Sequence, residues 1–290
     1  MANKSQAHFH ILKLSLFLLI FAPSLGRAQV DVSISLSDSR ILQGEPLYGF
    51  LKIVNNAGKD IKVGDFPGWL DIEVEQKSDG VAVKIGSLTH NDGLLISAGQ
   101  SQNIPLQINE LYDLMTVSRY TVTARLRIQS FENPFESKSQ FFDVVSGTKI
   151  WKQNYSAPSI SGIGGTPAVF TYNLMSNTGR HGKKLLFQIK DTDPDRIIRT
   201  VPICKMISFS KPEAKIDPAS NLHILCQYGR SSYTYNIYNP KGDLLLRTTY
   251  KADPAKPFLK KNLDGIIEVK GGKRIPMETD FLPKSLRVKK

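Results

Sequence analysis

Two residues that can act as nucleophile, base or metal ligand lie close together in the segment N-L-H-I-L-C-Q-Y, residues 221–228. His223 precedes Cys226, one of only two cysteines in the chain, by three positions. On a helix these side chains would share a face and could form a catalytic dyad or half of a metal site. The segment is short, however, and D-P-A-S and Y-G-R turns flank it. We therefore expect a strand, on which His223 and Cys226 point to opposite faces and form no dyad.

The other cysteine, Cys204 in V-P-I-C-K-M-I-S, is a better partner for Cys226. In an exported chain, two cysteines indicate first of all a single disulfide. A Cys204–Cys226 bond would close a loop of 22 residues and stabilise the fold by about 3 kcal/mol in the chain-entropy model. Two alternatives stay open, namely a pair of buried reduced cysteines and a reactive thiol.

Other combinations of residues that could carry chemistry are incomplete. D-T-D-P-D at 191–195 alternates acids like a calcium-binding loop, but Arg196 stands where such a loop needs glycine, and Pro202 where it needs glutamate. The histidines outside the first 28 residues are His90, His181 and His223, and none is paired at metal-ligand spacing. There is no G-x-S-x-G, the usual mark of a serine hydrolase. The sequence therefore predicts no catalytic residues, no cofactor and no metal site.

Two sets of residues are candidates for an interaction surface. Arg119, Arg125 and Arg127 lie on one face of R-Y-T-V-T-A-R-L-R-I-Q. They could form a contact surface for an anion, or simply the solvated face of a sheet. Tyr233 and Tyr235 share a face of S-S-Y-T-Y-N-I-Y. Exposed, these rings would form a platform for a sugar or a peptide; buried, they would belong to the sheet core.

The elements that must position these residues are strands. From about residue 30 to residue 147, apolar and polar residues alternate with period two, as in strands with one buried face. Turn clusters such as N-N-A-G-K-D, K-S-D-G and H-N-D-G separate the runs. Short strands at this spacing predict an all-β sandwich. The clearest apolar face comprises Tyr120, Val122, Ala124, Leu126 and Ile128.

Two of these stretches resemble bacterial immunoglobulin-like domains, and fibronectin-like or macroglobulin-like sandwiches fit as well. I-L-Q-G-E-P-L-Y-G-F-L-K-I-V-N-N-A-G-K-D-I-K-V is similar to their opening strands, and L-Q-I-N-E-L-Y-D-L-M-T-V-S-R-Y-T-V-T-A-R-L-R-I to their later corner and strand. The resemblance implies a sandwich over residues 29–147 with Tyr120 as corner tyrosine, its hydroxyl bonded to backbone a few residues upstream. Two departures are that this segment lacks cysteine and that Trp69 alternates onto the face opposite Leu70, so Trp69 is not expected to be the usual core tryptophan.

The second half of the chain is predicted to be a separate β domain. Residues 148–167, which include S-A-P-S-I-S-G-I-G-G-T-P, are rich in Gly, Ser and Pro and indicate a linker or long loop. Residues 168–276 are again strand-rich, with similar segments recurring at intervals of roughly 40 residues. We expect an antiparallel β-meander or a partial propeller-like domain, followed by a basic tail over residues 277–290. The layout D-P-A-S-N-L-H-I-L followed by N-P-K-G-D-L-L-L-R resembles uncharacterised secreted bacterial proteins, a likeness that implies no activity.

The first 28 residues have the three parts of a secretory signal peptide. Lys4 and Lys13 provide positive charge, an apolar run covers residues 14–22, and G-R-A at 26–28 offers small residues for cleavage. The run is short for a membrane span, which needs about 20 apolar residues. We therefore expect export to the periplasm or the outside. No later segment is apolar enough to cross a membrane, so no transmembrane span is expected after cleavage.

The charge of the chain limits its partners. The net charge is +12, and removing the signal peptide leaves +9. Such an excess attracts anions, but the basic residues are scattered and accompany no recognition motif, so nucleic acid is not expected. These features predict a non-enzymatic binding or structural protein of the cell envelope, whose partner is an anionic envelope polymer or another protein. Two alternatives stay open, namely a secreted hydrolase with a site assembled from distant residues and an accessory subunit of an envelope complex.

Overall fold

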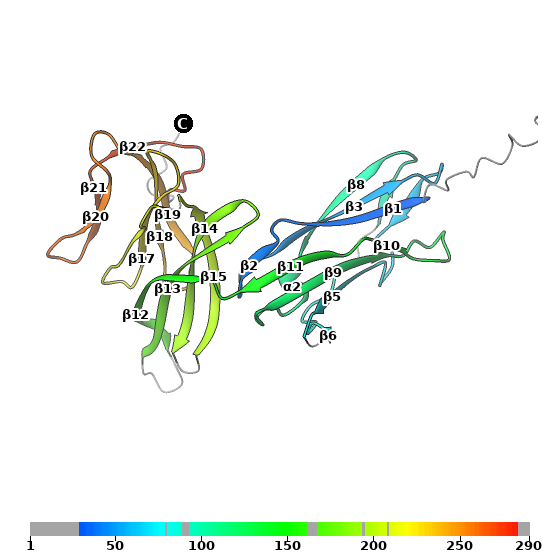
Figure 1. Cartoon of the computed structure of the whole chain (residues 1–290), viewed down its shortest axis with the longest axis horizontal. Helices are drawn as coiled ribbons and strands as arrows, with labels where there is room; N and C mark the ends of the chain where they lie inside the picture. Colours follow the sequence, from blue (N-terminus) through cyan, green and yellow to red (C-terminus); the bar gives the residue numbers. More distant parts are fainter. Residues whose placement is uncertain are drawn as a thin grey trace, which may run out of the picture.

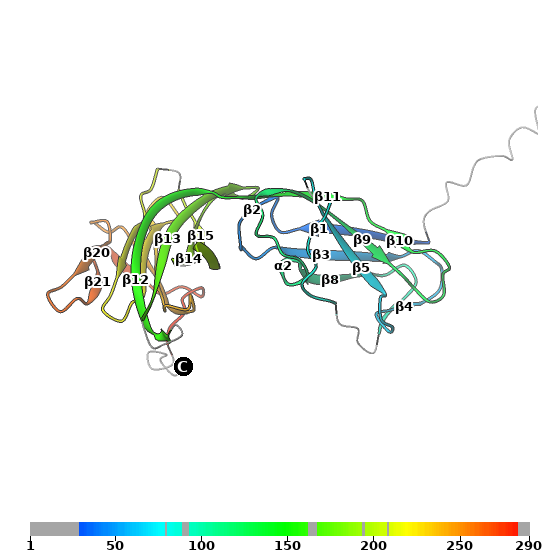
Figure 2. The ribbon, with the colours of Figure 1, turned by 90° about the horizontal axis from the view of Figure 1, so that it is seen from below.

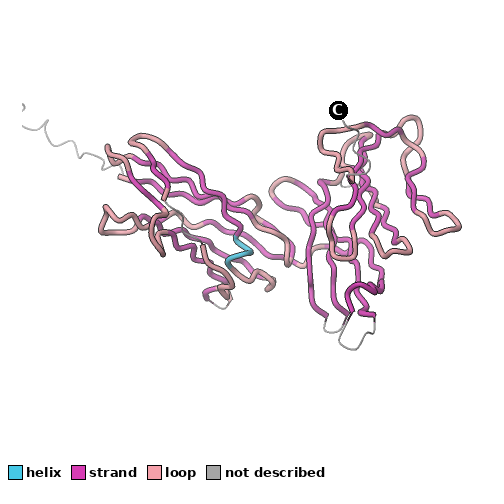
Figure 3. The backbone as a smooth tube through the Cα atoms, turned by 180° about the vertical axis from the view of Figure 1, so that it is seen from behind, coloured by secondary structure: helices cyan, strands magenta, loops and turns pink. Residues whose placement is uncertain are grey.

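The computed structural model describes residues 29–78, 80–88, 93–161, 167–192, 195–207 and 209–283. The predicted signal peptide, residues 1–28, lies outside them. Strands dominate the described chain, whose only regular helix is the four-residue α2 (Ile108–Leu111) (Figure 3). The prediction of an all-β protein is confirmed.

The N-terminal unit consists of two facing sheets around one hydrophobic core (Figure 1). A short separate pair is formed by β4 (Ile61–Val63) and β7 (Leu94–Ile96). The three-stranded sheet contains, in spatial order, β1 (Val30–Leu36), β3 (Tyr48–Asn55) and β8 (Ser101–Gln107). The larger sheet contains, in spatial order, β2 (Arg40–Leu42), β11 (Gln140–Val145), β9 (Ser118–Leu126), β5 (Leu70–Gln76) and β6 (Gly80–Val81), with β10 (Phe135–Glu136) also paired to β9.

Strand β9 shows why the alternating sequence folds this way. Its inward residues, including Tyr120, are fully buried, while the residues between them are partly exposed. The Tyr120 hydroxyl donates to the carbonyl oxygen of Thr116 at 2.9 Å, which is the backbone contact that the resemblance implies. Trp69 is 8% exposed and packs in the same core, so the expectation for it was wrong. Because β5 begins at Leu70, Trp69 belongs to the preceding turn, where strand alternation does not apply.

The C-terminal unit begins with a four-stranded antiparallel meander. Its first strand occupies residues 148–161, so the prediction of a linker was wrong for these residues. Trp151 and Tyr155 pack against the hydrophobic core of this unit and anchor the strand; residues 162–166, which hold the glycine cluster, lie outside the described residues. In spatial order the strands are β12 (Thr148–Ser161), β13 (Pro167–Gly179), β14 (Gly182–Thr192) and β15 (Asp195–Lys205).

A second antiparallel sheet faces this meander across a core that includes Tyr172, Phe187 and Tyr238. A hairpin of β20 (Phe258–Lys261) and β21 (Ile267–Lys270) covers the other face of the second sheet. Small antiparallel sheets stacked in this way are propeller-like, in line with the prediction. The strands of the second sheet are, in spatial order, β16 (Glu213–Ile216), β17 (Leu222–Gln227), β18 (Ser232–Tyr238), β19 (Leu244–Lys251) and β22 (Lys273–Ile275).

The two units lie end to end along the long axis of the molecule (Figure 2). Strand β11 leads directly into β12, and β2 lies beside β13. Part of the predicted tail packs on the C-terminal unit, because Thr249 donates to the Asp280 carboxylate at 3.0 Å. Residues 284–290 lie outside the described residues.

Candidate binding groove at the domain junction

The structure places His223 and Cys226 on opposite faces of β17, as the alternation predicts. Cys226 lies in the core between the two C-terminal sheets. His223, 5% exposed, points the other way, where Nε2 lies 3.1 Å from the Asp217 carboxylate and Nδ1 lies 2.6 Å from the Tyr235 hydroxyl. A carboxylate only accepts hydrogen bonds, so His223 donates through Nε2 and Tyr235 donates to Nδ1.

This Asp–His–Tyr arrangement has a structural and not a catalytic role. Burial lowers the pKa of His223, although Asp217 opposes the shift, and burial raises the pKa of Tyr235. Both rings are therefore neutral near neutral pH, and both ring nitrogens of His223 are already bonded. Asp217 also accepts bonds from the backbone and side chain of Asn221, at 2.8 and 2.9 Å, so the network fixes the turn between β16 and β17.

Cys204 and Cys226 are free thiols in the structure, so the predicted disulfide is not formed here. They lie on facing sheets, in β15 and β17, close enough for a thiol–thiol hydrogen bond. That bond and burial raise the pKa of Cys204. A thiol with a raised pKa is a poor nucleophile, which disfavours the reactive-thiol alternative. The structure comes closest to the alternative of two reduced cysteines, with Cys226 buried and Cys204 partly buried, and the disulfide stays a prediction.

The predicted arginine row is largely neutralised by its neighbours. Arg119 binds Asp143 through two bonds, 2.8 and 3.3 Å long. Arg125 contacts Glu73 at 3.1 Å and Glu136 at 3.4 Å. Arg127 lines a small cavity of about 230 Å³ on the N-terminal unit.

The predicted tyrosine pair lies in the core. Tyr233 and Tyr235 are 7% and 6% exposed and pack with Leu259 and Ile267 of the β20–β21 hairpin. They therefore form no surface platform. Of the sequence-predicted surface residues, Arg119 alone borders the junction between the two units, where a larger cavity opens.

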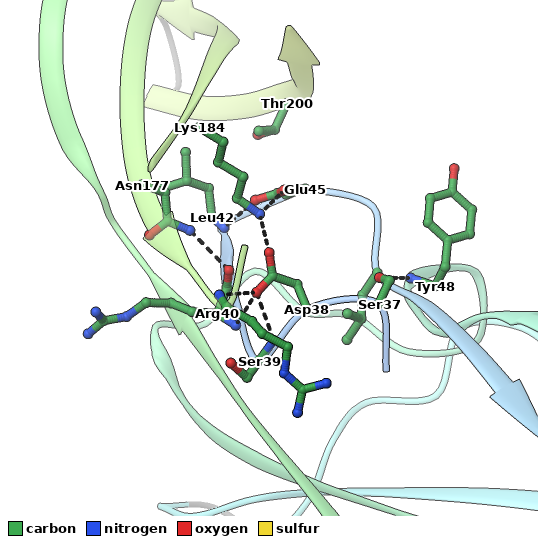
Figure 4. A network of polar contacts seen from close by, with 12 residues as sticks. Ser37, Asp38, Ser39, Arg40, Leu42, Glu45, Tyr48, Asn177, Lys184 and Thr200 are labelled. Carbon is green, nitrogen blue, oxygen red and sulfur yellow. Dashed lines mark hydrogen bonds and ion pairs between the residues drawn. The ribbon is translucent and has the colours of Figure 1, made fainter. Parts of the chain in front are cut away.

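The junction is held by a buried ionic cluster, which we call the junction clasp: Asp38, Glu45 and Lys184. The Lys184 ammonium reaches from β14 to the Asp38 carboxylate at 3.0 Å and to the Glu45 carboxylate (Figure 4). The other Glu45 oxygen accepts the backbone N–H of Leu42 at 2.8 Å. Burial raises the pKa of Glu45 despite the attraction of Lys184. Burial also acts to raise the pKa of Asp38, but hydrogen bonds from Lys184 and from the Arg180 backbone outweigh it, so that pKa is lowered.

Neutral contacts surround the clasp. The carbonyl oxygen of Gln43 accepts bonds from Gln188 at 3.1 Å and from the Thr200 hydroxyl at 2.6 Å. Gly179 approaches so closely that a Cβ there would lie 2.5 Å from an Asp38 carboxylate oxygen. The two units are thus in direct polar contact at several points, which fixes the surfaces on either side of the junction relative to one another.

A basic groove opens beside the clasp. We define the junction groove as two adjoining cavities of about 590 and 540 Å³ that share Arg40 and Thr178. The larger is also lined by Arg119, Arg180 and Phe141, and the smaller by Lys183. Phe141 is 63% exposed. None of the ion pairs in the described part of the chain includes Arg40, Arg180 or Lys183.

This arrangement suits an anionic ligand. Guanidinium groups bind carboxylate, phosphate or sulfate through paired hydrogen bonds, and an exposed aromatic ring offers a stacking surface. The sequence singled out Arg119 but gave no signal for Arg40, Arg180 or Lys183, because no local pattern joins them. Among the described residues no group of acids, histidines and cysteines could hold a metal ion, and none of the helices is long and apolar enough to cross a membrane.

Comparisons with known proteins leave the class of the protein open. No family model and no curated protein sequence matches the chain. Among solved structures it is similar to Spo0M, a sporulation control protein from Bacillus subtilis, with 10% sequence identity and a TM-score of 0.30 over 78% of this chain and 91% of that chain. A likeness this low carries no argument about fold or function.

Proposed function

We propose that the protein is an exported, non-enzymatic binding protein of the cell envelope, which holds an acidic polymer in the junction groove. The observation that carries this proposal is the convergence of Arg40, Arg119 and Arg180 on one open cavity. Asp143 is the one acidic residue that lines this cavity; it pairs with Arg119 and also attracts Arg40. Three arginines thus face a single carboxylate, and the cavity keeps an excess of positive charge. Guanidinium groups form strong paired hydrogen bonds with carboxylate or phosphate, so the cavity favours an anionic ligand over a neutral one.

The shape of the groove favours a polymer over a single small molecule. Its two cavities adjoin through Arg40 and extend along the seam between the units. Each cavity alone is within the usual size range of a small-molecule site, about 300–1,000 Å³. Together they can accept consecutive units of one chain, with Phe141 available for stacking on an unsubstituted ring face.

The clasp supports this function by keeping the groove in one shape. A site formed between two domains loses its geometry when the domains rotate, and fixing them reduces the entropy lost on binding. We also propose that the N-terminal unit is an immunoglobulin-like sandwich; its two facing sheets and the Tyr120 bond to Thr116 support this assignment.

The hydrolase alternative has less support. The only Asp–His–Tyr cluster noted above is buried, and its three side chains line none of the cavities described for the molecule. A general base must reach the proton that it removes, directly or through one water molecule. His223 is bonded on both ring nitrogens and is not placed for that task.

The test compares variants with equal net charge. The mature protein is sedimented with isolated envelope from its own source and, separately, with immobilised polygalacturonate, across a salt series. We expect the Arg40→Ala/Arg180→Ala variant to bind at least about tenfold more weakly, because each charge-assisted contact contributes roughly 1.5–3 kcal/mol. The control is Arg230→Ala/Arg274→Ala, which removes two exposed arginines that do not line the groove.

Equal weakening by both double variants would mean that net charge alone drives association, and the groove would be rejected as the site. Absence of sedimentation at every salt concentration would overturn the assignment to an envelope polymer. Binding that resists moderate salt in the wild type and in the control, but not in the groove variant, supports the proposal.

A further inference from the structure

A second polar cavity lies on the C-terminal meander and shares no lining residue with the junction groove. We call it the sheet-face pocket; its volume is about 310 Å³. It opens on the face of β12–β14 that points away from the second sheet. Strand register brings its residues together, because Lys152 pairs with Asn173, and Asn154 with Thr171, whose other neighbour is Lys190.

The floor of the pocket holds an unsatisfied polar atom. Asn173 is 3% exposed, and its side-chain oxygen has no hydrogen-bond partner. Leaving a buried polar atom unpaired costs roughly 1–3 kcal/mol, and a leucine of similar volume would avoid that cost. The neighbouring Gln188 is bonded to Gln43 and Thr200, so a polar residue can be satisfied at this depth. Less than 1 Å² of the Asn173 oxygen is accessible, so a donor from a ligand reaches it only when the Asn173 side chain turns toward the pocket.

The charges around the pocket are unevenly compensated. Lys149 and Lys152 on β12 are exposed, and neither takes part in an ion pair of the described residues. The acidic residues at the rim are partnered, since Asp195 lies 3.3 Å from Lys190 and Asp191 contacts an arginine. The pocket thus offers two free ammonium groups above a buried acceptor.

We propose that the sheet-face pocket binds one sugar unit that carries a carboxylate or a phosphate. The anion lies between the ammonium groups of Lys149 and Lys152, and a ring hydroxyl donates to the Asn173 oxygen. Thr171 donates to the Asn154 oxygen at 2.9 Å, which orients that amide so that its N–H groups remain available to a second hydroxyl. The pocket volume suits a single small ligand, near the lower end of about 300–1,000 Å³.

This site is independent of the junction groove, and separate variants distinguish the two. Calorimetric titration of the mature protein uses four probes: D-glucuronate, glucose 6-phosphate, glucose and inorganic phosphate. We expect glucuronate or glucose 6-phosphate to bind at least about tenfold more tightly than glucose or phosphate, because each of the latter lacks either the anion or the ring hydroxyls. Whichever of glucuronate and glucose 6-phosphate binds more tightly shows whether the anion recognised is a carboxylate or a phosphate.

The variants test each half of the pocket. Lys149→Gln/Lys152→Gln is expected to weaken binding at least about tenfold, whereas Lys205→Gln, an exposed lysine elsewhere on the same sheet, leaves it unchanged. Arg40→Ala/Arg180→Ala, the groove variant, should also leave it unchanged.

The Asn173→Leu variant separates a role of Asn173 in ligand binding from a role in stability. We expect it to abolish binding while the melting temperature stays the same or rises, because the unpaired buried oxygen is removed. A lowered melting temperature would mean that Asn173 has a structural role. That result would overturn the proposal, and so would binding that persists in Asn173→Leu. The proposal would also be overturned if neither glucuronate nor glucose 6-phosphate binds, or if inorganic phosphate binds as tightly as they do.

Discussion

Replacing Lys184 by methionine would leave two carboxylates facing each other at the domain junction without their shared cation. The side chains of Asp38 and Glu45 are only 13% and 5% exposed, and that of Lys184 is 16% exposed. Water therefore cannot replace the lost ammonium effectively. Removal of one partner from a buried ion pair costs about 3–5 kcal/mol, since the remaining charge stays desolvated and unpaired.

The expected shift in melting temperature follows from this range. For a chain of this size each kcal/mol lowers the midpoint by about 2–4 °C, so Lys184→Met should lower it by about 6–20 °C if the two units unfold together. Methionine fills nearly the same space as the lysine stem, so the change tests the charge more than the packing. Lys205→Met is the matched control, because Lys205 pairs with Lys184 in the sheet register but is exposed.

The two tryptophans allow each unit to be followed separately. Trp69 lies in the core of the N-terminal unit, and Trp151 packs against that of the C-terminal unit. Guanidinium denaturation of Trp69→Phe and Trp151→Phe backgrounds, monitored by fluorescence, should give coincident transitions with the clasp intact and separate transitions in Lys184→Met. A Lys184→Met protein within about 1 kcal/mol of the control, with coincident transitions, would refute the role given to the clasp.

The pH dependence of the same variant has a definite sign. Because the pKa of Glu45 is raised, the folded protein keeps the Glu45 proton at pH values at which the unfolded chain has lost it. As pH rises from the unfolded-state pKa through the folded-state pKa of Glu45, this group therefore lowers the stability of the fold. The lowered pKa of Asp38 contributes stability above its usual value, and this is lost as pH falls. Without Lys184 the pKa of Glu45 rises further, so its destabilising contribution grows, and the pKa of Asp38 is lowered less, so its stabilising contribution shrinks. The cost of Lys184→Met should therefore be smaller at about pH 5 than at about pH 8.

Three further changes test other parts of the structure. Gly179→Ala should weaken the junction by about 1–3 kcal/mol, because the new methyl group would collide with a clasp carboxylate, and thermal unfolding measures this. Tyr235→Phe removes the hydrogen bond to His223 Nδ1 and should cost about 1–3 kcal/mol in urea denaturation, with an unchanged result contradicting the buried network. Oxidation during refolding should join Cys204 to Cys226, which peptide mass mapping detects; exclusively reduced cysteines after refolding in oxidant would exclude the disulfide.

The fold could be predicted where one strand face is buried and the other is not. In β9 the period-two pattern located the strand and the inward position of Tyr120. The sequence is misleading for residues 148–161, because the Gly, Ser and Pro content of the downstream part is typical of a loop, whereas packing of Trp151 and Tyr155 against the core anchors β12. For predicting where a strand ends, the Gly, Ser and Pro content of a segment is therefore a weaker signal than large apolar side chains that can be buried.

The candidate sites depend on pairings that a single sequence does not contain. Arg125 was recognisable as part of a basic row, but Glu73, which neutralises it, comes from a strand about 50 residues away. The clasp joins Asp38 to Lys184 across an even longer separation. Asn173 illustrates a different limit, since it follows the core residue Tyr172 in β13 and yet is only 3% exposed, a degree of burial that alternation does not indicate.

The position of uncompensated charge, and not the total of +9 on the mature chain, decides where an anion binds. At physiological ionic strength charges act over about 8 Å, so scattered lysines and arginines contribute little to a single contact. In the N-terminal sheet Arg119 and Arg125 are neutralised locally. Free cations collect instead beside β12, at the junction groove on one side and at the sheet-face pocket on the other.

These two sites should respond differently to salt. The groove is open and its arginines are exposed, so its affinity for a polyanion should fall steeply as salt rises. The sheet-face pocket also relies on a hydrogen bond to the buried oxygen of Asn173, which salt does not screen. Titrating each probe between about 50 and 500 mM salt should therefore give a steep slope for polygalacturonate and a shallow slope for the sugar acid. Equal slopes would mean that the Asn173 bond contributes nothing to recognition and that both sites act through charge alone.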